Sequence, residues 1–182
     1  LSHLPIDAAN EIRTVWLGEN SATAAKTFLR PSLQLPAILI TEVGLSRLWM
    51  DWGVKPKALI GHSMGENAAA CVAGVMSFRD AVNLVHLRGK LFETIRPSGM
   101  MSVPLDHDRL CELLPASLDI ASVNAPSLCV VSGITADLDL FRESLARQGI
   151  DATRVTIDIA ATSRLVTPIL KAFAAFLSDI PL

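Results

Sequence analysis

The segment that most constrains the fold is the run Gly61-His62-Ser63-Met64-Gly65, in which a serine stands between two glycines at the Gly-x-Ser-x-Gly spacing. The mostly apolar residues 57–61 predict a short buried strand, and the alanine-rich residues 65–75 predict a helix. Between a strand and a helix, this motif is typical of a tight, strained turn that points the serine hydroxyl out of a sheet. The motif therefore predicts an α/β fold in which Ser63 is a candidate nucleophile.

The same turn predicts how negative charge would be stabilised next to Ser63. The backbone N–H of Met64 would face a developing oxyanion, and the N-terminus of the following helix would add partial positive charge. The alternative interpretation is a chance Gly-x-Ser-x-Gly in an ordinary turn.

Composition excludes several classes of protein. The 182 residues suit one domain, or one domain with a small inserted subdomain, and with 51% hydrophobic and 19% charged residues the chain can bury a core. A net charge of -2 without a basic stripe argues against nucleic-acid binding. The apolar run 68–76 is too short to span a membrane, which takes about 20 residues.

The termini and the cysteines indicate the compartment. Residues 1–5 have neither the basic start nor the apolar core of a signal peptide. Three widely spaced cysteines predict neither a disulfide framework nor a zinc site. A reducing, cytoplasmic location is therefore expected, with no bound metal.

The first half of the chain predicts mainly helices. Residues 5–30 are mostly helix formers, and residues 35–52 predict a stronger helix with Pro36 in its first turn and Gly53 just after its end. A further helix is expected over 78–94. Ser77 would cap it, and Asp80 would complete a capping box.

The second half predicts a small mixed subdomain. The expected elements are a strand over 99–105, a helix over 108–114, a strand over 118–123, a turn at 124–126, a strand over 128–132, a helix over 137–148 and a strand over 153–159. This β-α-β-β-α-β order is the ferredoxin-like split unit. A last helix is expected over 167–177, with Pro168 in its first turn.

Arg88 borders the apolar face of the predicted helix over 78–94 and need not point into open solvent. A partly buried arginine needs an anion, and its planar fork suits a carboxylate. Three partners stay open on spacing alone: a substrate carboxylate, an internal salt bridge, or bulk water reached by a snorkelling side chain.

The segment Leu59-Ile60-Gly61-His62-Ser63-Met64-Gly65-Glu66 resembles the active-site segment of malonyl-CoA:acyl-carrier-protein transacylases and of the acyltransferase domains of modular polyketide synthases. The similarity covers nearly the whole chain from about residue 30. It extends through 34–37, 45–54, 69–75, 80–82, 123–126, 131–133, 163–165 and 168–170.

This resemblance implies a fold and a domain organisation. The fold would be α/β, with an α/β-hydrolase-like large lobe over 1–97 and 160–182 and an inserted ferredoxin-like subdomain over 98–159. The family's glycine loop with its glutamine should precede residue 1, and the segment that closes the large lobe should follow residue 182. The large lobe is therefore expected to be incomplete at both ends.

The resemblance also implies a reaction. Ser63 would take a malonyl-type extender unit from coenzyme A as an ester and yield it to the phosphopantetheine thiol of an acyl carrier protein. Arg88 would bind the free carboxylate of the extender unit, and the remaining substrate-binding positions would be Gln34, His62, Asn124 and Ala161. No cofactor would be bound. The expected partners are the carrier protein and neighbouring domains, such as a ketosynthase, of a larger multifunctional enzyme.

One position departs from the family at the centre of its chemistry. The family's base histidine falls at Thr162, and threonine cannot accept a proton at neutral pH. His62 is usually structural in the family, and His3, His86 and His107 do not fit the role of the base. The stretch 160–162 matches neither the common malonyl pattern nor the methylmalonyl pattern.

Two other functions are weighed against an active acyltransferase. One is a catalytically impaired acyltransferase-like module with a structural or binding role in a synthase, which Thr162 favours. The other is an α/β-hydrolase or thioesterase. It would need an acid and then a histidine after the serine, and it has no use for Arg88.

Overall fold

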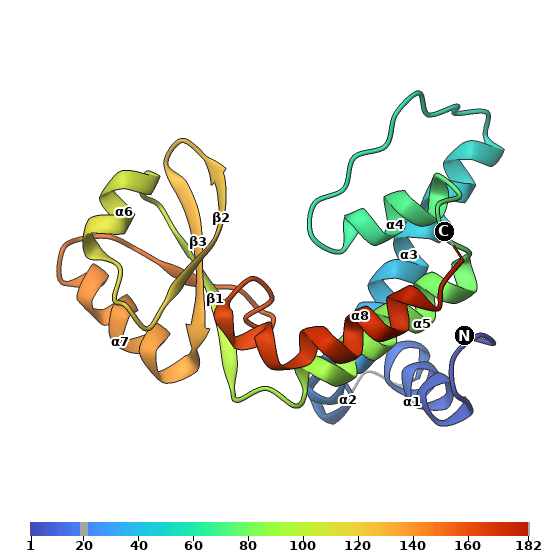
Figure 1. The fold of residues 1–182 in the computed structure, drawn as a ribbon, viewed down its shortest axis with the longest axis horizontal. Helices are drawn as coiled ribbons and strands as arrows, with labels where there is room; N and C mark the ends of the chain where they lie inside the picture. The colour runs from blue at the N-terminus through green and yellow to red at the C-terminus, as the bar shows by residue number, and fades with distance from the viewer. Residues whose placement is uncertain (19–21, 182) are drawn as a thin grey trace. The chain divides into compact units, whose positions relative to one another are not determined.

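The computed structural model describes residues 1–18 and 22–181 and divides the chain into two compact units, Leu1–Glu93 with Lys171–Leu182, and Thr94–Leu170 (Figure 1). These units group residues that pack together. The predicted lobes, 1–97 with 160–182 and 98–159, stay a prediction.

The regular structure among the described residues of the first unit consists of helices. Its helices are α1 (Ile6–Leu17), α2 (Ala22–Phe28), α3 (Pro31–Asp51), α4 (Gly65–Val72), α5 (Phe78–Phe92) and, from Lys171 onward, α8 (Leu170–Ser178). Its core consists of apolar side chains, with Ile12, Leu33, Leu39, Val43, Val82 and Val85 almost fully buried. Helices α3 and α5 lie side by side. A Cβ added at Gly89 would come within 2.5 Å of Pro31 O, so the start of α3 needs a glycine on α5.

Helix α3 begins earlier than the sequence predicts. Pro31 occupies its first turn, so the prediction that Pro36 does so is wrong, and Pro36 lies inside the helix. A proline inside a helix has no N–H to donate to the carbonyl four residues earlier. That carbonyl belongs to Ser32, and it lies 2.9 Å from Nδ1 of the buried His86. A carbonyl only accepts, so His86 is the donor, and it replaces the hydrogen bond that Pro36 cannot make.

The predicted ends of two helices are confirmed. Gly53, with φ of 94°, follows α3 and donates its N–H to Met50 O at 2.9 Å. At the start of α5, Ser77 Oγ accepts the N–H of Asp80 at 3.1 Å and donates to Asp80 Oδ2 at 2.5 Å.

The predicted buried strand over residues 57–61 is wrong for this chain. These residues form no strand, and Ile60 is 97% exposed. A strand needs a neighbour to pair with. Among the described residues of the first unit there is none.

The second unit contains an antiparallel sheet. Its strands are β1 (Ser98–Val103), β2 (Asp119–Ala125), β3 (Leu128–Ile134) and β4 (Thr153–Arg154), and its helices are α6 (His107–Leu113) and α7 (Thr135–Ala146). The strands lie in the order β2-β3-β1-β4. The predicted β-α-β-β-α-β order is therefore confirmed, and with it the ferredoxin-like unit.

Several boundaries in the second unit differ from the prediction. Strand β2 continues through Asn124 and Ala125, so the turn lies at residues 126–127. Strand β4 has only two residues, and Val155 just after it still donates its N–H to Met100 O of β1 at 2.9 Å. The chain does not enter an α-helix at residue 167 but first forms a 3-10 helix over Arg164–Ile169, which contains Pro168.

The two faces of the sheet differ in chemistry. One carries Met101, Val103, Cys129 and Val131, which pack in a buried core with Leu110 of α6 and with Leu138, Phe141 and Leu145 of α7. Since residues alternate between faces along a strand, the other face carries the buried serines Ser98 and Ser132.

Candidate active site

Ser63 has a backbone conformation that side-chain-bearing residues rarely adopt. Its φ is 55°, and it is the only non-glycine residue with positive φ among residues 1–18 and 22–181. Such a conformation costs energy and is often found at functional sites. Its side chain is exposed, immediately before α4. The sharp turn predicted from the motif is therefore present, although no strand leads into it.

The two glycines of the motif are not equivalent. A Cβ added at Gly61 would collide with the backbone of Gly65 and Glu66, so the chain can pass the start of α4 only with a glycine there. A Cβ at Gly65 would meet nothing within 4 Å among the described atoms. Gly61 is thus the glycine that this turn requires.

The backbone amides after Ser63 differ in their partners. Gly65 N–H donates to His62 O at 3.0 Å, and Glu66 N–H donates to Ser63 O at 3.2 Å. The N–H of Met64 makes no hydrogen bond within the described parts of the chain. It stands at the N-terminal end of α4, where a donor without a partner favours a nearby negative charge.

Arg88 lies close to this turn within the first unit. Its Nη1 is 4.0 Å from Met64 Sδ, and its guanidinium lies 5.4 Å from the centre of the Phe92 ring. The side chain is half-buried, and burial lowers the pKa of Arg88, while Glu66 acts in the opposite direction. No salt bridge joins Arg88 to a carboxylate in the part of the chain that the structure describes. The internal salt bridge considered above is therefore not seen, and the guanidinium is free to hold an external anion.

The remaining predicted residues fall into both units. In the first, Gln34 is half-buried on α3, and its Oε1 is buried with no hydrogen bond to any described residue, whereas His62 is exposed. In the second, Asn124 is exposed in β2, Ala161 is half-buried and Thr162 is exposed. The structure thus brings Ser63, Met64 and Arg88 together, and their roles stay predictions.

The histidines other than His62 are engaged elsewhere. His86 is only 5% exposed, and burial lowers its pKa. His107 Nδ1 lies 3.1 Å from Asp108 Oδ1, and His3 packs edge-on against the Phe78 ring. These contacts agree with the expectation that none of the three serves Ser63 as a base.

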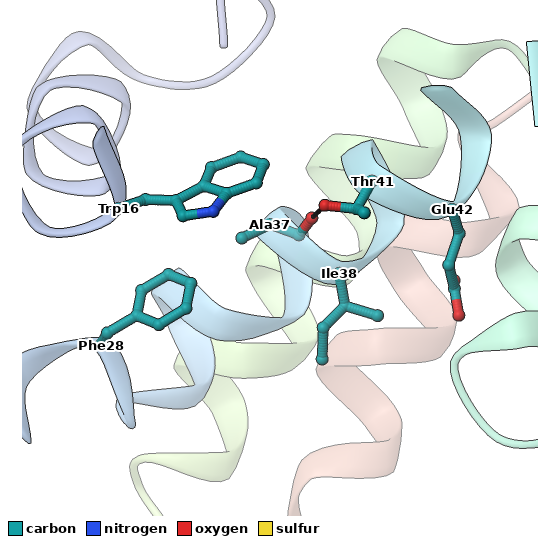
Figure 2. A pocket seen from close by; sticks show the side chains of 6 residues that line it. All are labelled: Trp16, Phe28, Ala37, Ile38, Thr41 and Glu42. Carbon is teal, nitrogen blue, oxygen red and sulfur yellow. Dashed lines mark hydrogen bonds between the residues drawn. The ribbon is translucent and has the colours of Figure 1, made fainter. Parts of the chain in front are cut away.

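A pocket of about 230 Å³ lies away from these residues, where α1, α2 and α3 meet (Figure 2). Trp16 and Phe28 stack with ring centres 6.5 Å apart on one side of it, and Glu42 lies on the other. Burial raises the pKa of Glu42, whose Oε2 has no described hydrogen-bond partner. None of the predicted site residues lines this pocket.

Other kinds of site are not seen in the described parts of the chain. Residues 1–18 and 22–181 contain no group of three or more His, Cys, Asp or Glu side chains placed to hold a metal ion. None of the helices formed by these residues has both the length and the apolar character needed to cross a membrane. The cysteines at 71, 111 and 129 are free.

Sequence reasoning missed residues that fix the backbone around Thr162. Ser132 Oγ donates to Thr162 O at 2.7 Å, Ala160 N–H donates to Ser98 Oγ at 3.2 Å, and Arg164 pairs with Asp119. No local pattern in the sequence points to these contacts, because their partners lie about 30 to 60 residues apart.

Comparisons with a family model and with known sequences identify the same family. The acyl transferase domain family matches residues 20–182. The chain is 38% identical to the polyketide synthase GfsA of Streptomyces halstedii over 151 residues, which is 80% of this chain and 2% of that protein. It is 37% identical to the mycoketide-CoA synthase of Mycobacterium tuberculosis over 146 residues, 80% of this chain and 4% of that protein.

Solved structures agree with the sequences. The acyl transferase domain of SpnD in complex with 2-(pent-4-yn-1-yl)malonyl matches with a TM-score of 0.81 and 33% identity, covering 97% of this chain and 43% of that one. FabD from Acinetobacter baumannii matches with a TM-score of 0.78 and 27% identity, covering 96% and 60%. The chain thus spans less than two thirds of each of these relatives.

Proposed function

Because this chain belongs to the acyl transferase domain family, we propose that it moves a malonyl-type extender unit from coenzyme A to the phosphopantetheine thiol of an acyl carrier protein. The predicted relationship to polyketide-synthase acyltransferases is confirmed, as is the predicted α/β fold with a ferredoxin-like unit. The substrate, the carrier protein and the acyl-enzyme are the proposal.

The reaction would proceed through an ester on Ser63. The Ser63 oxygen attacks the thioester carbonyl, the carbon–sulfur bond breaks, and the coenzyme A thiol leaves with the serine proton. The carrier thiol then attacks the ester, its sulfur forms the new thioester, and its proton passes to the Ser63 oxygen as the ester bond breaks. The Met64 N–H would stabilise the oxyanion in both steps, since it has no described partner of its own.

The observation that carries this proposal is the backbone of Ser63. A φ of 55° at an exposed serine, on a turn that requires Gly61, is the conformation that a nucleophile elbow needs. An ordinary turn would relieve this strain with glycine or asparagine.

Arg88 supports a donor that carries a free carboxylate. Its guanidinium is half-buried beside Met64 and has no described salt bridge, so a malonyl carboxylate would supply the missing anion. The SpnD domain was solved in complex with a substituted malonyl group, which agrees with a donor of this class for the present chain.

Thr162 supports a second candidate, an impaired acyltransferase-like module with a structural or binding role. His3, His86 and His107 have the contacts described above, and the resemblance to the family assigns a structural role, not that of the base, to His62 beside Ser63. A hydrolase or thioesterase is not supported, because the proteins matched above are acyltransferases or polyketide synthases.

The parts of the domain that this chain does not cover would complete the site. The chain spans 43% of the SpnD chain, and residues 57–61 lack strand neighbours here. In a complete domain these residues would pair as the strand that precedes the elbow. The carrier protein and a neighbouring ketosynthase would then be partners in the larger polypeptide.

The test is the intact mass of the purified chain after incubation with malonyl-CoA or methylmalonyl-CoA. An adduct of one acyl group that is absent in Ser63→Ala supports the proposal. Thr162→His should raise the rate of transfer to a carrier protein, whereas a substitution at the neighbouring Ala161 should not restore a base. No adduct from either donor would rule out the active enzyme and leave the impaired module.

A further inference from the structure

The Arg88 guanidinium packs against an aromatic ring and has no carboxylate partner. Among residues 1–18 and 22–181, the arginines that form a salt bridge with a carboxylate are Arg30, Arg109, Arg154 and Arg164. Arg88 is not one of them. Its guanidinium carbon lies over the Phe92 ring, 5.4 Å from the ring centre.

Helix α5 brings this ring and this charge together. Phe92 follows Arg88 by four residues, so the two side chains lie on the same side of the helix. Phe92 is only 6% exposed, and packing therefore fixes the position of its ring. A guanidinium within about 6 Å of the centre of a ring is attracted by the electron-rich face of that ring, and more strongly where water is excluded. Since Arg88 is half-buried, the attraction should be strong here.

A second contact connects the guanidinium to the turn at Ser63. Nη1 of Arg88 lies 4.0 Å from Sδ of Met64, the residue between Ser63 and the start of α4. All of these residues belong to the first unit. The ring of α5 and the thioether of the turn thus contact one guanidinium, next to the candidate nucleophile.

An aromatic ring holds a guanidinium in a different way from a carboxylate. A carboxylate takes up N–H donors in hydrogen bonds, so it would compete with the carboxylate of an incoming donor. A ring attracts the charge as a whole and leaves these donors available. An arginine that is already held in place also loses less rotamer freedom when a ligand binds to it.

We propose that Phe92 is a positioning residue whose ring holds the Arg88 guanidinium beside the Ser63 turn before a donor binds, with its N–H groups left free for the donor carboxylate. The holding rests on contacts within the first unit. Its benefit to donor binding rests on the proposed function.

The mobility of Arg88 tests the holding without any activity. In Phe92→Leu, the NMR order parameter of the Arg88 Nε–H bond should fall, because leucine has no ring to attract the charge. The matched control is Phe78→Leu, which removes the other ring of α5 that lies against an arginine, 5.2 Å from the guanidinium of Arg47. That variant should mobilise Arg47 and leave Arg88 unchanged. An Arg88 order parameter that is the same in both variants would overturn the proposal.

The kinetics of Ser63 acylation test the benefit to donor binding. In Phe92→Leu, the malonyl-CoA concentration that gives half the maximal rate should rise about threefold to tenfold, while the maximal rate stays the same. Acylation by acetyl-CoA, which has no carboxylate, should not change, and Phe78→Leu should behave as the unsubstituted chain. Equal losses with both donors would show that Phe92 only supports the fold, and would overturn the positioning role.

Fluorinated phenylalanines at position 92 keep the shape of the ring and serve if Phe92→Leu does not fold. Each added fluorine weakens the electron-rich face, so the half-saturating concentration of malonyl-CoA should rise stepwise. A constant value across the series overturns the proposal. If neither donor acylates the unsubstituted chain, the proposed function fails and the benefit to donor binding falls with it. The order parameters of Arg88 then still decide whether the ring holds the guanidinium.

Discussion

Arg88 brings a positive charge into a half-buried position where Glu66 acts on it only at a distance and no described carboxylate forms a salt bridge with it. Desolvation of an unpaired guanidinium costs free energy, and a partner anion recovers it. The contact with Met64 places this demand beside the turn at Ser63. At the scale of single residues, Arg88 is therefore where substrate charge should matter most.

Replacing Arg88 should act on donors with a carboxylate and spare those without one. In Arg88→Ala we expect acylation by malonyl-CoA to slow by roughly 10- to 100-fold, since a hydrogen bond to a charged group contributes about 1.5–3 kcal/mol. Acetyl-CoA, which has no carboxylate to bind, should lose little. Rates of adduct formation by mass spectrometry measure both. Arg79→Ala, an exposed arginine on the same helix, is the control, and equal losses with both donors would contradict the role.

His86 should make stability depend on pH. Burial lowers its pKa below the usual value of about 6.5, with Lys90 acting in the same direction and the Ser32 carbonyl and Glu93 opposing it. The unfolded chain therefore takes up the proton at higher pH than the folded chain. Neutral His86 therefore contributes its full share to the free energy of unfolding above about pH 6.5, and this contribution is lost as the pH falls below that value.

The expected result is a melting temperature that drops between about pH 7.5 and pH 5.5 and drops less in His86→Leu. The control is His107→Leu, which removes an exposed histidine. Its melting temperature should depend on pH in the same way as that of the unsubstituted chain. A profile that does not respond to His86→Leu would show that other groups set the acid sensitivity.

Helices α3 and α5 depend on each other through one carbonyl. Pro36 leaves Ser32 O without its helical donor, and His86 Nδ1–H of α5 takes that place at 2.9 Å. The buried interior of α3 tolerates a proline because α5 supplies the donor.

A double-mutant cycle tests this exchange of donors. His86→Leu should reduce the free energy of unfolding by about 1–3 kcal/mol, because it leaves a buried carbonyl unsatisfied. In a Pro36→Ala background the loss should be smaller, since the alanine introduced there has an N–H for Ser32 O. Urea unfolding of the four variants gives the coupling energy. Additive effects would mean that the two residues do not share the carbonyl.

Elements set by local chemistry are those that the sequence predicts well. The Ser77 cap, Gly53 and the turn at Ser63 depend on residues within a few positions of one another. The donation from His86 to Ser32 and the three side chains that hold residues 160–164 depend on partners far along the chain, so no local pattern predicts them. The prediction of a strand over 57–61 was wrong for the same reason. The apolar pattern of these residues suits a strand, but the described residues of the first unit include no strand for it to pair with.

At the scale of the whole molecule, each of the two units has a buried core, and each also leaves large apolar side chains exposed. Those exposed in and after α3 include Leu45, Leu48, Trp49, Trp52, Leu59 and Ile60. Exposed apolar surface of this kind marks a place where protein normally packs. It agrees with a chain that spans 43% of the solved SpnD chain.

The amide hydrogens of residues 57–61 should therefore exchange at different rates in this chain and in a complete acyl transferase domain. We expect their amides to exchange rapidly in this chain and slowly in a complete acyl transferase domain, where strand neighbours would protect them. Amides of β3 serve as the internal control, since they are paired on both sides here. Equal protection of residues 57–61 in both proteins would contradict the strand.

Because the backbone of Ser63 is left-handed, thermal stability and formation of the acyl ester favour different residues at position 63. Glycine adopts a φ of 55° without a steric penalty, whereas for serine it costs about 1 kcal/mol, so Ser63→Gly should melt higher although it can form no ester. A library randomised at position 63 and sorted only for heat resistance should therefore enrich glycine and asparagine. Sorting the same library for acylation should return serine. Selection for heat resistance alone would therefore replace the nucleophilic serine.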